Sequence, residues 1–159
     1  MRELPLKRGL LTAAGIVVAD QVSKWLILER FLADPTPVEV LPFFNLVLTW
    51  NRGVSFGAFN DGGAYNAWIF TGVAAVIVVF LLGWLRKADT PLVIAALGGI
   101  IGGAVGNVID RLRLDAVVDF LDLHAAGYHW PAFNVADSAI VVGAIVLVAD
   151  ALFRRGKLE

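Results

Sequence analysis

Two aspartates stand in apolar surroundings, where an ionised side chain is costly. Asp119 lies between Val118 and Phe120, and Asp137 follows Asn134-Val135-Ala136 at the start of the last apolar segment. An ionisable group at the edge of hydrocarbon is a functional-site hypothesis by default. If the two carboxylates meet, they cannot both ionise readily and would share one proton. One could then act as general base on a water and the other as general acid toward a carbonyl.

A plainer interpretation of Asp137 is also open. Asn134 and Asp137 have the spacing of a helix N-cap and its third following residue, and capping alone would account for both. The apolar lead-in Trp130-Pro131-Ala132-Phe133 favours chemistry, because it places Asp137 in a poorly solvated zone. Asp115 and Asp122 compete for a place in a carboxylate pair, and we expect both to be solvated loop acids.

Further polar residues lie where they could support such a site. Asp20 and Lys24 are four residues apart and share a helix face, as an internal ion pair, as part of a site, or both. Asn107 and Arg111 have the same spacing at the end of an apolar run. There we expect a polar helix end in which Arg111 holds Asp110 or a loop carbonyl, so that Asp110 stays ionised as a structural anchor.

Other kinds of chemistry fit less well. His124 and His129 are five residues apart and lack the glutamate of a helical zinc motif, so we expect no metal. Ser23 and Lys24 are adjacent and do not face each other on a helix, which disfavours a Ser–Lys dyad. The chain has no cysteine, and its net charge of −1 offers no field for nucleic acid.

The segments that carry these residues are apolar enough to lie in a lipid bilayer. Of the 159 residues, 58% are hydrophobic, against roughly 45–50% in soluble domains. Four apolar runs reach the length of about 20 residues that spans a membrane. We therefore expect a single integral membrane domain over residues 1–159, with transmembrane helices at about 10–28, 64–85, 91–109 and 135–153. The third run is rich in glycine, which lets helices approach closely and predicts a central position.

Lysines and arginines near the helix ends predict the orientation. Arg2, Lys7, Arg8, Arg86, Lys87, Arg154, Arg155 and Lys157 fall on one side, and Lys24, Arg30, Arg52, Arg111 and Arg113 fall on the other. The excess on the first side predicts that both termini are cytoplasmic and that segments 30–63 and 110–134 lie outside.

The first outer segment is not helical in pattern. Residues 38–50 are rich in β-branched and aromatic types, Pro42 argues against a long central strand, and Asn51-Arg52-Gly53 and Asn60-Asp61-Gly62-Gly63 indicate turns. We expect a hairpin or small sheet on the outer membrane face. The fold class is thus a mainly α membrane protein, with four transmembrane helices and a small extracytoplasmic β-rich subdomain.

Five stretches, in this order, resemble the lipoprotein signal peptidases (signal peptidase II), bacterial membrane enzymes that cut lipid-modified prolipoproteins. They are Asp20-Gln21-Val22-Ser23-Lys24, Asn51-Arg52-Gly53-Val54-Ser55-Phe56-Gly57, Gly106-Asn107-Val108-Ile109-Asp110-Arg111, Val118-Asp119-Phe120 and Phe133-Asn134-Val135-Ala136-Asp137-Ser138. Each stretch alone is weak, but five in order with four spans and this length are highly specific. The match covers roughly residues 15–150.

The resemblance implies an aspartic endopeptidase that needs no metal or other cofactor, with Asp119 and Asp137 as its catalytic pair. The family's supporting residues fall on Asp20, Lys24, Asn51, Gly53, Asn107, Asp110, Arg111, Asn134 and Ala136. The implied substrate is a prolipoprotein whose lipobox cysteine carries a diacylglyceryl group, cleaved just before that cysteine.

The resemblance also implies a place in the bacterial cytoplasmic (inner) membrane, among membrane lipids, with the active site near the outer face. It implies inhibition by cyclic peptides such as globomycin, and we expect a monomer that binds no nucleic acid. One rival is a small transporter or channel subunit with Asp20, Lys24 and Asp137 as a proton or ion path; another is a non-catalytic membrane scaffold. Four helices are few for a transporter, and inverted repeats are absent from the sequence.

Overall fold

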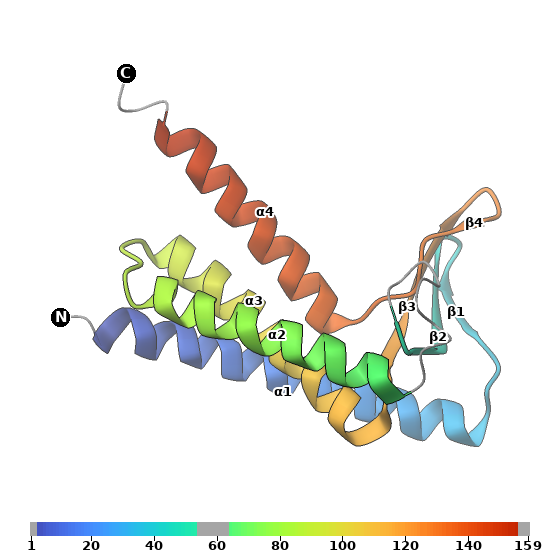
Figure 1. Ribbon diagram of the computed structural model, residues 1–159. Helices are drawn as coiled ribbons and strands as arrows, with labels where there is room; N and C mark the ends of the chain where they lie inside the picture. Colours follow the sequence, from blue (N-terminus) through green and yellow to red (C-terminus); the bar gives the residue numbers. More distant parts are fainter. Residues whose placement is uncertain (1–2, 54–63, 156–159) are drawn as a thin grey trace.

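The computed structural model describes residues 3–53 and 64–155, which form four long helices and a small antiparallel sheet (Figure 1). The helices are α1 (Glu3–Ala33), α2 (Ala64–Leu85), α3 (Pro91–Leu114) and α4 (Val135–Arg155), and the strands are β1 (Val38–Leu41), β2 (Phe44–Asn51), β3 (Val117–Ala125) and β4 (Tyr128–His129). Each of the four helices is long and apolar enough to cross a membrane. The expected fold class, mainly α with four spanning helices and a small sheet, is confirmed.

Helix α3 is the centre of the bundle, as its glycines predict. In its most apolar stretch 67% of the residues are buried, against 11% in the corresponding stretches of α2 and α4. A Cβ added at Gly102 would lie 2.6 Å from the backbone oxygen of Ala13 on α1, and one added at Gly103 would collide with the backbone oxygen of Ala136 on α4. The missing side chains therefore let α1 and α4 pack against the backbone of α3.

The ends of α3 are set by local chemistry. Thr90 caps its start, accepting a hydrogen bond from the Val93 N–H (3.3 Å), with Pro91 in the first turn. The helix ends where Asp115 adopts the left-handed conformation, with φ of 54°. Helix α3 thus ends at Leu114, beyond the expected limit near residue 109. The turn at Asp115 then directs the chain into β3.

The sheet has the order β1-β2-β3-β4, with all neighbours antiparallel. Strands β1 and β2 form the expected hairpin, and Pro42 lies in its turn. Strand β3 pairs with β2 from Phe44 opposite Leu123 to Asn51 opposite Val117. The sequence pattern suggested only that this later segment folds back, and the pairing with β2 was not anticipated. The turn expected at residues 60–63 lies outside the described residues.

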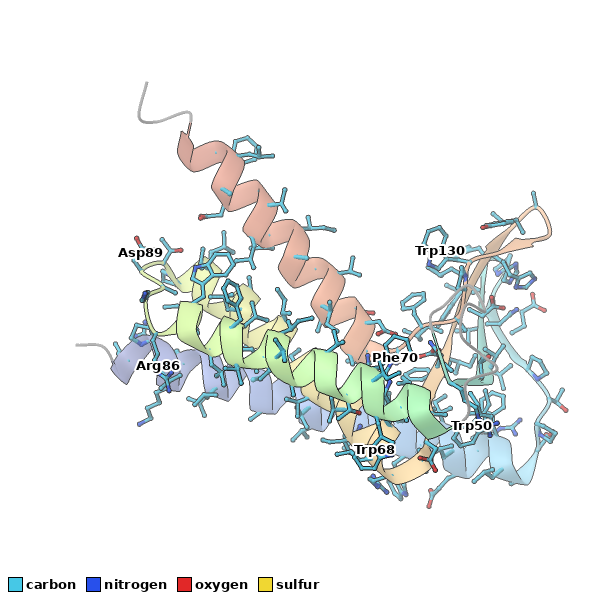
Figure 2. The ribbon with its side chains drawn as sticks, viewed as in Figure 1. Trp50, Trp68, Phe70, Arg86, Asp89 and Trp130 are labelled. Carbon is cyan, nitrogen blue, oxygen red and sulfur yellow. The ribbon has the colours of Figure 1, made fainter. Side chains whose placement is uncertain are left out.

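The sheet lies at one end of the helix bundle, and the loop between α2 and α3 lies at the other (Figure 1). Arg86 and Asp89 mark the loop end, and Trp50 and Trp130 mark the sheet end (Figure 2). Helix α4 leans away from the other three helices along its length (Figure 1). Within the described residues it packs on α3 and α1 and makes no contact with α2.

Candidate active site

Asp119 and Asp137 are brought together by one residue, Asn134. The side-chain amide of Asn134 donates to Asp119 Oδ1 (2.7 Å), and its backbone N–H donates to Asp137 Oδ2 (3.3 Å). Asp119 lies near the start of β3, and Asp137 lies in the first turn of α4. Asp119 is only 2% exposed, and Asp137 is half-buried. The two carboxylates from separate elements therefore share one small, poorly solvated space.

Each carboxylate accepts a second hydrogen bond from another amide. Asn51 Nδ2 donates to Asp119 Oδ2 (2.9 Å), and Asn107 Nδ2 donates to Asp137 Oδ1 (2.8 Å). The backbone N–H of Gly53 donates to Asn51 Oδ1 (3.1 Å), which fixes the orientation of the Asn51 amide. All these donors are neutral, so they orient the oxygens without forcing both carboxylates to ionise.

The start of α4 is attached to β3 by backbone hydrogen bonds. The oxygen of Phe133 accepts from the N–H groups of Phe120 (3.0 Å) and Leu121 (2.8 Å), and its own N–H donates to Leu121 O (3.1 Å). The next residue, Asn134, is the expected N-cap, because its Oδ1 accepts from the N–H of Asp137 (2.8 Å). The capping interpretation of Asn134 and Asp137 is thus confirmed, and the capping residue Asn134 is the one whose amide contacts Asp119.

Beneath this pair lies a buried cluster of charges centred on Lys24. Its Nζ is 2.9 Å from Asp20 Oδ2 and 2.7 Å from Asp110 Oδ2, and it donates to Asn107 Oδ1 (3.0 Å). All three donors of the ammonium group are therefore in use. The expected ion pair of Asp20 and Lys24 is confirmed.

Of the two partners expected for Arg111, Asp110 was wrong, since Asp110 pairs with Lys24 instead. The carbonyl that Arg111 does bind belongs to its own helix and not to a loop. Arg111 Nη1 donates to the backbone oxygen of Asn107 (3.4 Å), and its guanidinium lies 5.4 Å from the ring centre of Phe70. Neighbouring side chains on a helix point about 100° apart. Asp110 consequently faces α1, and Arg111 faces the ring of Phe70 on α2.

The two carboxylates of the Lys24 cluster also hold the backbone next to the pair. Asp110 Oδ2 accepts from the N–H of Val118 (3.1 Å), and Asp20 Oδ1 accepts from the N–H of Ala136 (2.9 Å). Val118 precedes Asp119, and Ala136 precedes Asp137. One buried cluster thereby fixes the position of both peptide groups that lead into the paired aspartates.

Burial raises the pKa of Asp119 to about 7, and the nearby charge of Asp137 adds to this effect. The hydrogen bonds from Asn51 and Asn134 and the charge of Lys24 act in the opposite direction. A carboxyl group with this pKa is protonated in about half of the molecules near neutral pH. The pair is therefore suited to hold one proton between two carboxylates.

Known proteins match this chain along almost its whole length. The family model described as signal peptidase (SPase) II matches residues 12–153. The chain belongs to the signal peptidase II family. A protein named lipoprotein signal peptidase from Methylobacterium sp. (strain 4-46) is 42% identical over 154 residues, covering 96% of this chain and 93% of that protein. Its counterpart from Rhodopseudomonas palustris (strain ATCC BAA-98 / CGA009) is 46% identical over 153 residues, covering 93% of each.

Two solved structures have the same fold. A bacterial membrane enzyme determined by the in meso method at 2.3 Å superposes with a TM-score of 0.81 and 28% identity, covering 95% of this chain and 91% of that one. A second, at 1.9 Å, has a TM-score of 0.76 and 30% identity, covering 91% and 92%. The resemblance to signal peptidase II is confirmed, and this chain is a multi-pass membrane peptidase of that family.

Gln21 is a residue of this signal peptidase II site that the sequence analysis did not single out. Its Nε2 lies 3.2 Å from Asp20 Oδ2, 2.9 Å from Asp110 Oδ1 and 3.2 Å from the backbone oxygen of Gly106. It therefore joins the two carboxylates that Lys24 pairs with. The signal was available, because an amide stands directly beside a buried acid in an apolar helix.

Asp122 is not the solvated loop acid that we expected. It lies in β3 with 6% exposure, accepts a hydrogen bond from Asn45 Nδ2 (3.1 Å), and contacts His129 Nδ1 (2.8 Å). Strand pairing buries it, and that pairing is not visible in the local sequence. Asp115 is exposed, as expected. Within residues 3–53 and 64–155, no group of three or more His, Cys, Asp or Glu is arranged to hold a metal ion.

Proposed function

We propose that this chain removes signal peptides from bacterial prolipoproteins, with Asp119 and Asp137 as its catalytic pair. The substrate's lipobox cysteine carries a diacylglyceryl group, and the enzyme cuts the peptide bond just before it. The observation that carries the proposal is the contact of one residue, Asn134, with both carboxylates. The family and the names of its relatives support the reaction class.

The chemistry follows from one proton held by two carboxyl groups. The ionised member takes a proton from water as the water oxygen attacks the scissile carbonyl carbon, and the protonated member gives its proton to the carbonyl oxygen. The resulting gem-diol then collapses. Its C–N bond breaks, the leaving nitrogen takes the proton that came from water, and a hydroxyl proton returns to the other carboxylate. One water is consumed, and the pair regains its starting state.

The supporting residues divide into two groups. Asn51, Asn107 and Asn134 hold the reacting oxygens directly, with Gly53 orienting Asn51. The second group is the buried cluster of Asp20, Lys24 and Asp110, together with Ala136, whose N–H the cluster binds. Lys24 is paired with two carboxylates of its own, and its charge lowers the pKa of Asp119 less than burial raises it.

In this proposal the site lies at the outer face of the membrane, because it stands at the sheet end of the bundle. The positive-inside pattern supports an orientation with both termini in the cytoplasm and the sheet at the outer face of the inner membrane. Trp50, Trp68 and Trp130 lie at the sheet end (Figure 2), where tryptophans favour the membrane–water interface. A substrate with an apolar helix and a lipid would reach this depth by lateral diffusion. Cyclic peptides such as globomycin would compete with the substrate for this site. The enzyme is expected to act as a monomer.

An ion path through Asp20, Lys24 and Asp137 has less support. Lys24 uses all its donors inside the cluster, and Asp20 also binds the backbone of α4. A residue that relays ions must exchange its partners, whereas these contacts fix the fold.

The decisive experiment replaces Asp119 or Asp137 with Asn and measures cleavage of a purified lipidated prolipoprotein in detergent. We expect losses of about 10³-fold or more, because essential catalytic groups in other hydrolases cost that much. Asp115→Asn is the matched control, because Asp115 is exposed at the end of α3 and Asn tolerates its left-handed backbone. Normal turnover by a folded Asp119→Asn or Asp137→Asn enzyme would refute the proposal.

A further inference from the structure

An apolar groove of about 600 Å³ opens directly beside Asp137. One wall comes from the segment that follows β4 and includes Trp130 and Ala132. The other wall comes from α4 and includes Ile140 and Val141. Trp130 projects from the hairpin on the side of the sheet that faces α4 (Figure 2). The volume lies within the range of about 300–1,000 Å³ that is typical of small-molecule pockets.

The groove connects the catalytic pair to the lipid-facing surface of α4. At one end stands the carboxylate of Asp137. At the other end Val141 and Val142 are 56% and 60% exposed, and the exposed surface continues along the helix to Ile145 and Val148. In a membrane enzyme such a surface contacts hydrocarbon. The groove is therefore a continuation of the lipid-contacting face that reaches the site of chemistry.

The wall opposite α4 offers few N–H donors to a peptide backbone. The N–H of Trp130 donates to Leu123 O (2.8 Å), Pro131 has no N–H, and the N–H and oxygen of Phe133 are both bonded to β3. On α4, the hydroxyl of Ser138 donates to Asn134 O (2.9 Å). A peptide in this groove would find few N–H donors for its own carbonyl oxygens, and leaving them unpaired away from water is costly. A hydrocarbon chain carries no such groups and would gain from burial.

We propose that this groove holds an acyl chain of the substrate's diacylglyceryl group, at the point where the chain leaves the glyceryl. The inference rests on the proposed function, because it places the lipidated cysteine next to Asp137. Asp137 and Val141 are one helical turn apart, about 6 Å along the axis. A chain that enters beside the scissile bond thus reaches the bilayer within about one turn of α4. The groove therefore contacts only the part of the acyl chain that is nearest the glyceryl group, and the far end of the chain lies in the bilayer.

The test narrows the groove and varies the lipid. Val141→Phe and Ala132→Leu each fill it from one wall. Val148→Phe is the matched control, because Val148 lies two turns further along the same face of α4, is 61% exposed, and does not line the groove. Each enzyme is given one prolipoprotein sequence carrying either a dipalmitoylglyceryl or a diacetylglyceryl group.

We expect the wild type and Val148→Phe to prefer the dipalmitoyl substrate. In both narrowed variants, kcat/KM for that substrate should fall about tenfold, the scale of an apolar pocket contact. The diacetyl substrate should be cut as before. An unchanged chain preference in the narrowed variants would overturn the inference, and so would an equal loss for both substrates, which would indicate that peptide fills the groove. If the wild type cuts neither substrate, the proposed function itself fails.

A photoreactive diazirine near the ester end of the acyl chain gives a direct readout. The probe peptide is held by Asp119→Asn enzyme, which is expected to bind it without cleaving it. Crosslinks should fall within residues 130–142, and a free phospholipid with the same diazirine should label this segment much less. Crosslinks elsewhere, or equal labelling by the phospholipid, would overturn the assignment to the substrate's lipid.

Discussion

The site contains two pairs of carboxylates whose hydrogen-bonding partners differ in charge, and all but the half-buried Asp137 are buried. Asp20 and Asp110 each contact the ammonium group of Lys24 and a backbone N–H. Asp119 and Asp137 accept their hydrogen bonds from asparagine amides and from the backbone N–H of Asn134. The first pair is therefore held by a cation in fixed ion pairs, whereas a carboxyl group among neutral donors can keep a proton. Residues of one type thus serve as fixed anchors in one pair and, in our proposal, as acid and base in the other.

The largest expected effect comes from removing the cation that distinguishes the pairs. Lys24→Met leaves Asp20 and Asp110 buried without a counter-charge, and breaking a buried ion pair in this way costs about 3–5 kcal/mol. We expect a large drop in thermal stability in detergent. Arg30→Met is the matched control, because Arg30 also pairs with an aspartate four residues away on the same stretch of chain, but with both side chains about half exposed (46% and 53%). Equal drops in the two variants would show that the buried cluster is not an anchor.

The next effect tests whether the anchors position the catalytic pair. A Cβ added at Gly106 would lie 2.5 Å from Asp20 Oδ2, so Gly106→Ala must displace Asp20 from Lys24 or from the N–H of Ala136. Overpacking of this kind costs about 1–3 kcal/mol, and we expect kcat to fall more than tenfold with KM little changed.

Gly99→Ala is the control for this change on the same helix. Its added Cβ meets only the backbone oxygen of Ala139, at 3.7 Å, which is ordinary contact. Activity and melting temperature should stay near those of the wild type. If Gly106→Ala keeps full kcat, the position of Asp20 does not matter for catalysis.

The pH dependence of activity and of stability tests the proton that the catalytic pair holds. Because the pKa of Asp119 is about 7 rather than 3.8, the single shared proton is lost as pH rises through 7, and kcat/KM should fall there. The folded state also binds this proton more tightly than the unfolded state, so the Asp119 contribution makes the enzyme less stable as pH rises from about 4 to 7.

Thermal unfolding measured from pH 5 to 8 checks the sign of this contribution. Asp119→Asn should remove most of the loss of stability over that range, while Asp115→Asn should keep it. The hydrogen bond from Asn51 lowers the pKa of Asp119, so Asn51→Ala should move the alkaline limb of activity to higher pH. A limb that does not move would separate Asn51 from the titrating group.

The same contrast explains what could be foreseen from the sequence. The four spans, the hairpin and the cap at Asn134 depend on neighbours in the chain, and all are present in the structure. The counter-ion of Asp110 was misassigned to Arg111, because its true partner Lys24 lies on another helix. The burial of Asp122 was missed for a similar reason, since it depends on pairing between β2 and β3. Local patterns revealed which residues are polar in apolar surroundings, but not which of them meet.

Gln21 offers the smallest and most specific test of the anchor pair. Gln21→Met keeps the length of the side chain and removes the amide that joins Asp20 and Asp110. Both acids keep Lys24 and a backbone N–H, so the loss of stability should be near 1 kcal/mol, the net worth of a hydrogen bond. We expect kcat to fall a few-fold at unchanged KM. Gln21→Glu should be worse than Gln21→Met, because it adds a third carboxylate beside a single ammonium group. If Gln21→Glu were as active as the wild type, charge balance would not be what separates the anchors from the catalytic pair.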